Sequence, residues 1–297
     1  MMSDKVPHIL VTGASGLLGR AVVKVFKEKK FSVTGLAFSR VGPGLVKCDL
    51  TDHEAVTSLL EKEKPDVIIH SAAERFPDVV ENKYEETRLL NIKTAAHIAS
   101  VARRIGSRVI HISTDYVFDG TSPPYKPEDK CNPLNKYGIT KWESEKAVLA
   151  EATDACILRI PVLYGPVERL EESAVTTLLK TLKSDAPQSV SHHDQRCPAQ
   201  VNDIAHILAD MTALIWKGDK MQGIYQWSGR QKMTKYDMIL TMSRIFSLPH
   251  AHLTPSHTPS TIRPYDPEMD VARLTDLGIS HHTNFEDGVK ECLAVWV

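Results

Sequence analysis

The sequence is poor in cysteine, and the cysteines it has stand apart from one another. Five cysteines are spread over 297 residues, and no two form a CxxC pair. This spacing argues against a zinc knuckle and against a disulfide framework, and it favours reduced thiols in a cytosolic-type compartment. The histidine pairs at 192–193 and 281–282 lack carboxylates at ligand spacing, so we interpret them as surface loops and predict no metal site.

Long hydrophobic runs and an excess of either charge are also missing. No apolar stretch is long enough to span a bilayer, and the short polar segment before the first predicted strand does not resemble a signal peptide. The formal net charge of −1 provides no general attraction to nucleic acid or to an anionic membrane. We therefore expect a cytoplasmic globular protein with neither nucleic acid nor membrane as a partner.

What is present is a regular alternation of apolar strands and amphipathic helices. Strands are predicted at 9–11, 32–37, 66–72, 109–113 and 155–160, and helices at 20–30, 53–62, 84–105 and 138–150. Such alternation predicts an α/β fold, namely a Rossmann-type doubly wound parallel sheet.

The pattern loosens after residue 164, which predicts a smaller mixed C-terminal lobe over the carboxyl ends of the strands. Its expected helices are 172–183, 203–216, 235–246 and 285–295, with a short strand at 223–227. We predict an NADP-binding Rossmann domain over 1–165 and a smaller substrate or partner lobe over 166–297. The chain is expected to cross between the two more than once.

Three glycines follow the first strand at three-residue spacing and open a helix. Gly13 permits a tight turn, Gly16 lets the backbone approach a pyrophosphate, and Gly19 lets the helix lie close to the strand. A glycine triplet alone is a weak signal, and its other interpretation is an ordinary loop. The strand before it and the helix and second strand after it supply the context that a dinucleotide site requires.

The second predicted strand ends in Phe38, Ser39 and Arg40 and has no acidic residue after it. A site that prefers NAD usually carries an acid here for the adenosine ribose. A guanidinium suits a 2′-phosphate instead, so the sequence favours NADP(H). The alternative is that Arg40 is only a solvated loop charge.

A tyrosine and a lysine stand four residues apart at the start of a predicted helix. Tyr137 and Lys141 then share one helix face, where an ammonium favours the phenolate and the phenol can donate a proton to a carbonyl. Ser113 and Thr114 lie at the end of a predicted strand, where a hydroxyl could hydrogen-bond the same carbonyl. The competing interpretations are an exposed Tyr–Lys pair and a turn or cap built by hydroxyls.

Four runs extend these features: VTGASGLLG, STDYVFDG, PLNKYGITK and RIPVLYG. They resemble the extended short-chain dehydrogenase/reductases, and within them dTDP-4-dehydrorhamnose reductase. The resemblance implies the catalytic residues Ser113, Thr114, Tyr137 and Lys141. The candidate cofactor-binding residues are Thr12, Gly13, Ser15, Gly16, Leu17, Leu18, Gly19, Phe38, Ser39, Arg40, Asp49, Leu50, Ala72, Ala73, Asn91, Tyr137, Lys141, Ile160 and Pro161.

A narrower resemblance covers both lobes. Residues 70–82, 167–175, 227–229 and 233–236 resemble the regulatory β subunits of methionine adenosyltransferase. This implies an NADP(H)-binding, non-catalytic regulator that associates with the catalytic α subunits, which make S-adenosylmethionine, and it implies a longer C-terminal tail than follows the last predicted helix. The alternative is an active NADPH-dependent reductase that uses Thr114, Tyr137 and Lys141. Both share one fold and one cofactor site, so the site residues alone do not separate them.

Overall fold

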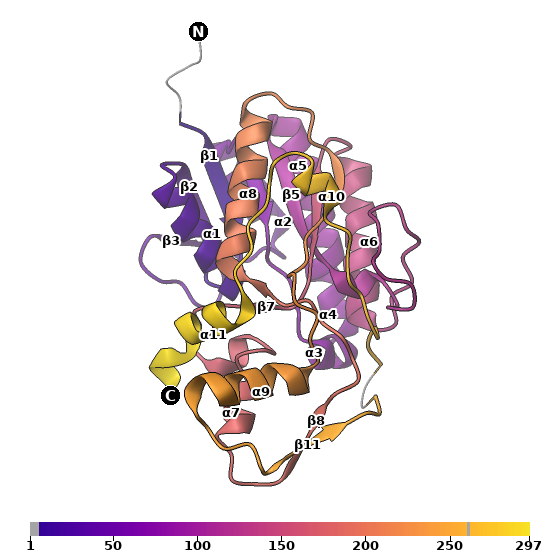
Figure 1. Ribbon diagram of the computed structural model, residues 1–297. Coiled ribbons are helices and arrows are strands. Elements are labelled where there is room, and N and C mark those ends of the chain that lie inside the picture. Colours follow the sequence, from indigo (N-terminus) through magenta and orange to yellow (C-terminus); the bar gives the residue numbers. More distant parts are fainter. Residues whose placement is uncertain (1–5, 260–261) are drawn as a thin grey trace.

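The computed structural model describes residues 6–259 and 262–297, and a seven-stranded parallel sheet forms its centre (Figure 1). The strands run in the order β10-β6-β5-β4-β1-β2-β3. Their bounds are β1 His8–Thr12, β2 Ser32–Ala37, β3 Leu45–Lys47, β4 Val67–His70, β5 Arg108–Thr114, β6 Cys156–Ile160 and β10 Gly223–Gln226. The order reverses between β1 and β4, and ligands of open α/β sheets bind outside the carboxyl ends of the strands at such a point.

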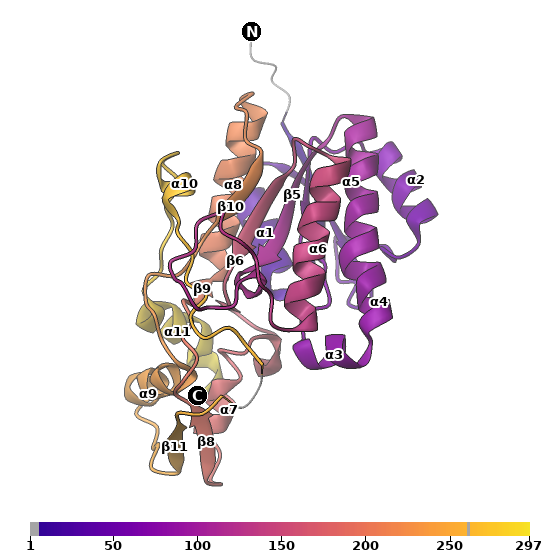
Figure 2. The same cartoon turned by 90° about the vertical axis from the view of Figure 1, so that its right-hand side faces the viewer.

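Helices cover both faces of this sheet (Figure 2). The helices α1 (Leu17–Glu28) and α8 (Val201–Trp216) pack together on one face, and α2 (His53–Glu63), α5 (Thr94–Ile105) and α6 (Lys136–Glu151) cover the other. Both layers bury continuous apolar clusters against the strands, and every residue of β4 is buried. Burial on two faces is the reason these strands read as unbroken apolar runs. The predicted doubly wound sheet is confirmed.

The chain builds a second lobe below the carboxyl ends of the strands. It contains helices α7 (Leu178–Leu182), α9 (Lys235–Phe246) and α11 (Phe285–Leu293) around a separate apolar cluster. Two short parallel pairs, absent from the sequence-based prediction, complete it: β7 (Leu163–Tyr164) with β9 (Ala199–Gln200), and β8 (Gln188–Ser191) with β11 (Leu253–Ser256). Between β9 and β11 the chain returns to the lobe that contains the seven-stranded sheet, where it forms α8 and β10.

The helix predicted over 172–183 is much shorter in the structure. A 3₁₀ turn, η3, spans Leu170–Glu172, and α7 begins only at Leu178. The residues between are rich in β-branched and hydroxyl side chains, which favour non-helical backbone. Ser173 donates to the Leu163 carbonyl at 2.5 Å, and Thr176 donates to the Leu170 carbonyl at 2.7 Å.

The helix predicted over 84–105 is interrupted. The chain forms α4 (Tyr84–Arg88), a π-helical turn η1 (Leu89–Lys93) and then α5. A π turn inserts one extra residue and often marks a functional position. Here it contains Asn91, whose amide binds the backbone N–H of Glu74 at 2.8 Å and its carbonyl at 3.0 Å.

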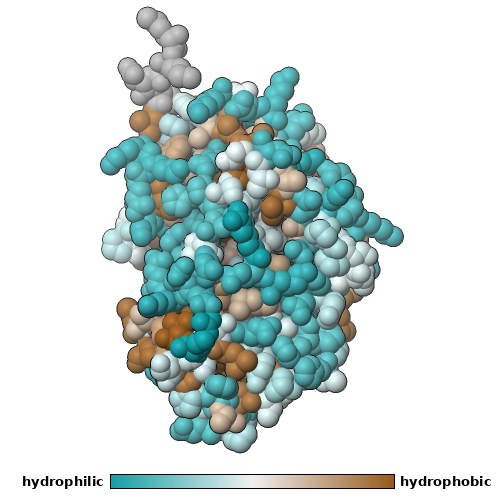
Figure 3. Space-filling model, viewed as in Figure 1, coloured by the Kyte–Doolittle hydropathy of each residue, from teal (hydrophilic) through white to brown (hydrophobic). Residues whose placement is uncertain are grey.

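The remaining short helices are α3 Pro77–Asn82, α10 Ala272–Thr275, η2 Asp115–Val117 and η4 Ala294–Trp296. Within the described residues, no helix is long and apolar enough to cross a membrane. The surface in Figure 3 is mostly hydrophilic, and apolar side chains gather where Figure 1 places α11 and the end of the chain. Val295 and Val297 are both exposed there.

A buried ion pair ties α6 to β6 and provides a stability test. The Glu145 and Arg159 side chains are 3% and 2% exposed, and their charged groups lie 2.8 Å apart. Because Glu145→Gln leaves a buried guanidinium without its counter-ion, we expect the unfolding free energy to fall by roughly 3–5 kcal/mol in urea titrations. Glu61→Gln breaks the exposed pair with Arg104 and should cost less than about 1 kcal/mol. Equal losses in the two variants would show that burial does not strengthen the Glu145–Arg159 pair.

Candidate functional site

The turn after β1 brings the backbone of α1 into contact with the end of the strand. Gly13 has φ +68°, a left-handed conformation that other residues rarely adopt. A Cβ at Gly19 would lie 2.1 Å from the Gly13 carbonyl oxygen, and a Cβ at Gly13 would lie 3.0 Å from the backbone of Ala72. These two glycines are therefore required by close packing between α1, β1 and the loop after β4.

The first turn of α1 faces this edge of the sheet with its positive end uncompensated. Gly16 is the N-cap and offers no side-chain acceptor, and the first turn contains no acidic residue. Leu17 and Leu18 point into the apolar core, which leaves the backbone N–H groups as the polar feature of this turn. A helix N-terminus of this kind is suited to bind an anionic group such as a pyrophosphate.

A cavity of about 490 Å³ opens beside the glycine turn. Its walls include Ser15, Arg20, Ser39, Arg40 and Glu168. Phe38 is 59% exposed at the rim of the sheet beside these residues. The position fits the adenosine ribose, because these residues follow β1 and β2 at the carboxyl edge of the sheet.

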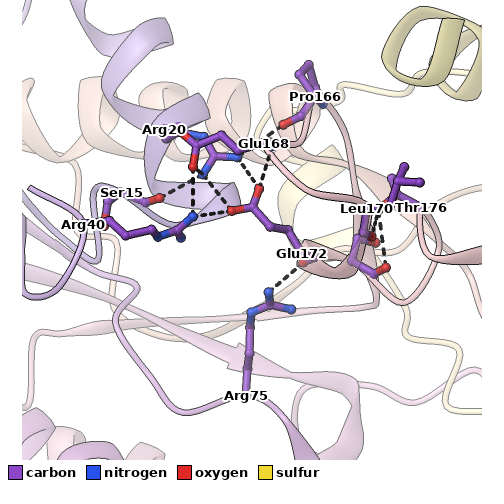
Figure 4. Close-up of polar contacts among 10 residues, drawn as sticks. Ser15, Arg20, Arg40, Arg75, Pro166, Glu168, Leu170, Glu172 and Thr176 are labelled. Carbon is purple, nitrogen blue, oxygen red and sulfur yellow. Dashed lines mark hydrogen bonds and ion pairs between the residues drawn. The ribbon is translucent and has the colours of Figure 1, made fainter. Parts of the chain in front are cut away.

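Three arginines, from α1 and from the loops after β2 and β4, contact the segment through which the chain enters the second lobe (Figure 4). Arg40 binds both Glu168, at 2.9 Å, and Glu172. Arg20 donates to Glu172 at 2.6 Å and to the Ser15 carbonyl at 2.8 Å. Arg75 donates to the Glu172 backbone carbonyl at 2.6 Å. We call Arg20, Arg40 and Arg75 the arginine cluster.

Glu172 is the most buried acid in this group. Its side chain is 4% exposed, whereas that of Glu168 is 58% exposed. Burial on its own raises the pKa of Glu172, but the hydrogen bonds from Arg20 and Arg40 outweigh it and lower the pKa to about 2. Glu172 is therefore an anion at physiological pH, and it neutralises guanidinium charge beside the cavity.

Other candidate cofactor residues hold the strand ends in place. The Thr12 hydroxyl lies 2.8 Å from His70 Nδ1 and accepts from the Ala72 N–H at 3.2 Å. Asp49 accepts from the backbone and hydroxyl of Thr51. Other candidate cofactor-binding residues lie at or just after the carboxyl ends of the strands. Of these, Leu50, Ile160 and Pro161 are buried and Ala73 is half-buried.

Thr114 and Tyr137 meet at the end of β5. Their hydroxyls are hydrogen-bonded, and Thr114 also donates to Asp115 at 3.1 Å. Burial raises the pKa of the Tyr137 phenol above its ordinary value, and the bond to Thr114 offsets only part of this. Without another influence, Tyr137 stays a neutral proton donor rather than a phenolate.

Lys141 lies on the same helix, and its amine is directed to the sheet. Its Nζ is 3.2 Å from His111 Nε2, and the side chain is almost fully buried. Burial lowers the pKa of Lys141 to about 8, although Glu145 favours the charged form. Burial and Lys141 also lower the pKa of His111, so this imidazole is neutral and can accept from the ammonium.

Ser113 lies apart from the Thr114–Tyr137 pair. Successive side chains of a strand point to opposite faces, and the Ser113 hydroxyl donates to Glu145 at 2.5 Å inside the buried network with Arg159. The structure therefore brings together Thr114 and Tyr137, with Lys141 one turn away, and it directs Ser113 into the core.

Sequence reasoning missed two groups of residues at this edge, the buried histidines His70 and His111 and the pair Glu145–Arg159. It also missed the ion pairs that Glu168 and Glu172 form with Arg20 and Arg40. Histidines inside apolar strands were a signal for the first group. Nothing in the linear sequence placed Glu172 against Arg20 and Arg40, because the contact joins residues more than 130 positions apart.

The histidine pairs contact side chains from distant parts of the chain. His281 lies 2.6 Å from Asp210, and the His282 ring stacks on Trp227 with 4.4 Å between centroids. His192 lies 2.8 Å from the Thr234 hydroxyl. In the described part of the chain, no group of three or more potential ligands is placed to hold a metal ion.

The strand order, the glycine turn and the Thr–Tyr–Lys arrangement define a Rossmann-type protein of the reductase-like class. The model of the family described as RmlD substrate binding domain matches residues 7–297, so the chain belongs to that family. It is 45% identical over 288 residues to a Xenopus tropicalis protein named methionine adenosyltransferase 2 subunit beta, covering 96% of this chain and 86% of that protein. It is 31% identical to a dTDP-4-dehydrorhamnose reductase from Aggregatibacter actinomycetemcomitans, covering 79% of this chain and 78% of the reductase.

Solved structures agree with this fold. A hypothetical dTDP-4-dehydrorhamnose reductase from Sulfolobus tokodaii superposes with a TM-score of 0.82 at 29% identity, covering 95% of this chain and 98% of that one. A dTDP-4-dehydrorhamnose reductase from Bacillus anthracis, in complex with NADP, has a TM-score of 0.84 at 22% identity, with 98% and 99% covered. The resemblances predicted from sequence motifs are confirmed.

The buried ammonium of Lys141 predicts a pH-dependent stability difference. Below pH 8 the folded state bears the cost of the buried charge, and this cost disappears as the pH rises from about 8 to 10.5, the ordinary lysine value. Lys141→Met should therefore raise the melting temperature at pH 7 by a few degrees, and the gain should shrink towards pH 10. The control Lys146→Met changes an exposed lysine on the same helix. A gain that grows with pH would refute the assignment.

Proposed function

We propose that this chain is a regulatory, non-catalytic subunit of methionine adenosyltransferase that binds NADP(H) and modulates S-adenosylmethionine synthesis in the cytoplasm. The observation that carries the proposal is the 45% identity to a protein named as the β subunit of that enzyme, which extends through both lobes. Identity to the reductase from Aggregatibacter is lower and covers less of the chain. The partner would be the catalytic α subunits, in a hetero-oligomer.

The geometry of the glycine turn supports the cofactor. The uncapped start of α1 suits a pyrophosphate, and the cavity beside it carries Ser39 and Arg40 where an adenosine ribose would lie. Arg40 supplies the planar donor fork that a 2′-phosphate accepts. When bound, NADP(H) would supply or accept a hydride at its nicotinamide. Gly13, Gly16 and Gly19 would admit its phosphates, and Lys141 would hold hydroxyl groups of a ribose.

The second candidate is an NADPH-dependent dTDP-4-dehydrorhamnose reductase. The hydrogen-bonded pair Thr114 and Tyr137 favours it, because a neutral phenol held by a hydroxyl can protonate a carbonyl oxygen. Lys141, one turn along α6, is engaged with His111. The two candidates differ in the partner and in turnover, and both can be measured.

The cofactor preference is tested by calorimetry. NADPH should bind more tightly than NADH, because a charge-assisted bidentate contact to a phosphate is worth roughly 1.5–3 kcal/mol, or about tenfold or more in affinity. Arg40→Ala should narrow this gap, while Arg104→Ala, in the last turn of α5, should leave it unchanged. Equal affinities for the two cofactors in the unchanged chain would contradict NADP(H) selectivity.

The partner is tested by mixing the purified chain with the methionine adenosyltransferase catalytic subunit. Co-elution at micromolar concentrations is expected on size-exclusion chromatography. Absence of a complex, together with robust oxidation of NADPH by dTDP-4-dehydrorhamnose, would assign the chain to the reductases.

Any reductase turnover that exists depends on Tyr137. Tyr137→Phe should reduce turnover by about 10²-fold or more, because only the proton donor is lost, and should leave NADPH binding nearly intact. Tyr236→Phe, a tyrosine on α9, serves as the control. Full turnover in the Tyr137→Phe protein would exclude the tyrosine as the acid.

A further inference from the structure

The carboxylate of Glu172 lies where an anionic ligand of Arg40 would bind. Arg20 and Arg40 both donate to it, and Arg75 holds its backbone carbonyl at 2.6 Å (Figure 4). Arg40 also lines the cavity beside the glycine turn. A phosphate and a carboxylate use the same planar donor fork of a guanidinium. The chain thus already supplies an anion to the residue best placed to recognise a 2′-phosphate.

This internal contact comes from the other lobe. Glu172 ends the 3₁₀ turn η3, which follows β7, where the chain enters the second lobe. The Arg20, Arg40 and Arg75 side chains come from α1, the loop after β2 and the loop after β4. An event that removes Glu172 from the arginine cluster therefore acts on the segment 166–176 and not only on a surface side chain.

The charges favour exchange rather than addition. Glu168 and Glu172 together offset the charges of Arg20 and Arg40, so a 2′-phosphate that approached with both acids in place would meet two like charges. Glu168 is exposed and can turn towards solvent, whereas Glu172 is buried between the guanidinium groups. Both acids bind Nη1 of Arg40, so a phosphate that takes the donor fork of Arg40 at this nitrogen displaces the Glu172 carboxylate.

We propose that Glu172 is an internal competitor of the cofactor 2′-phosphate and that its displacement couples NADP(H), but not NAD(H), to the segment 166–176. This inference rests on the proposed binding of NADP(H) and adds a specificity-determining residue to that site. NAD(H) lacks the 2′-phosphate and leaves the contact of Glu172 with Arg20 and Arg40 intact. The segment then reports which of the two cofactors is bound.

The first test compares cofactor affinities by calorimetry. Glu172→Gln keeps the shape of the side chain and removes its charge, so NADPH affinity should rise about tenfold while NADH affinity stays the same, the size expected for one charge-assisted contact. Glu171→Gln is the matched control, because Glu171 lies in the same turn and pairs with Lys180 instead of an arginine of the cluster. Unchanged or weaker NADPH binding in Glu172→Gln would overturn the inference.

The second test needs no variant and uses amide hydrogen exchange. The backbone N–H of Glu168 donates to the Glu172 carboxylate at 3.1 Å and loses that acceptor when the carboxylate leaves. NADPH should speed exchange at Glu168 at least severalfold, and NADH should not. Equal effects of the two cofactors would refute the coupling. If the unchanged chain does not bind NADPH, the proposed function fails at the first measurement. If it binds NADPH without these differences, only the role of Glu172 fails.

Discussion

The close approach of α1 to β1 at Gly13 and Gly19 is the contact on which the site depends. A Cβ at Gly19 would lie 2.1 Å from the Gly13 carbonyl oxygen, so any other residue would move α1 away from the strand. The same contact aims the uncapped start of α1 at the edge where β1, β4 and β5 end. The cavity with Arg40 and the Thr114–Tyr137 pair both lie along this edge. Their positions follow from the sheet order.

Electrostatics then joins the two lobes across this edge. The buried Glu172 carboxylate is stabilised by Arg20 and Arg40, and a buried charge is retained only when it is paired. Under the proposed function, the same arginines both hold Glu172 and recognise the cofactor. A ligand with a phosphate at this position would exchange one anion for another instead of filling an empty site. Under the proposed function, the second lobe is therefore part of the cofactor site, although its residues are distant in sequence.

The sequence predicted the features that arise from local patterns. Buried strands, the glycine turn and the Tyr137–Lys141 spacing each depend on neighbouring residues, and the structure contains all of them. The π turn at Asn91 was missed, because an inserted residue leaves the helical periodicity almost unchanged over a short span. The helix predicted over 172–183 was too long, because the hydroxyl groups of Ser173 and Thr176 bind backbone carbonyls outside this segment.

The candidate site was only partly predictable for a related reason. Motifs identified Thr114, Tyr137 and Arg40 but carried no information on their long-range partners. Ser113 was grouped with Thr114 by adjacency, yet strand alternation sends it to Glu145 in the core. The assignment of the site residues remains a prediction. So does the domain division near residue 165, since α8 and β10 lie after it in the chain but belong to the lobe with the seven-stranded sheet.

The central claim is that this chain regulates a synthetase rather than reducing a sugar nucleotide. The most direct measurement is the rate of S-adenosylmethionine formation by the methionine adenosyltransferase catalytic subunit, titrated with this chain at saturating NADPH. We expect a saturable change in kcat or KM that reaches its limit at a fixed stoichiometric ratio. A rate that stays the same throughout the titration, with the chain folded and loaded with NADPH, would contradict the claim.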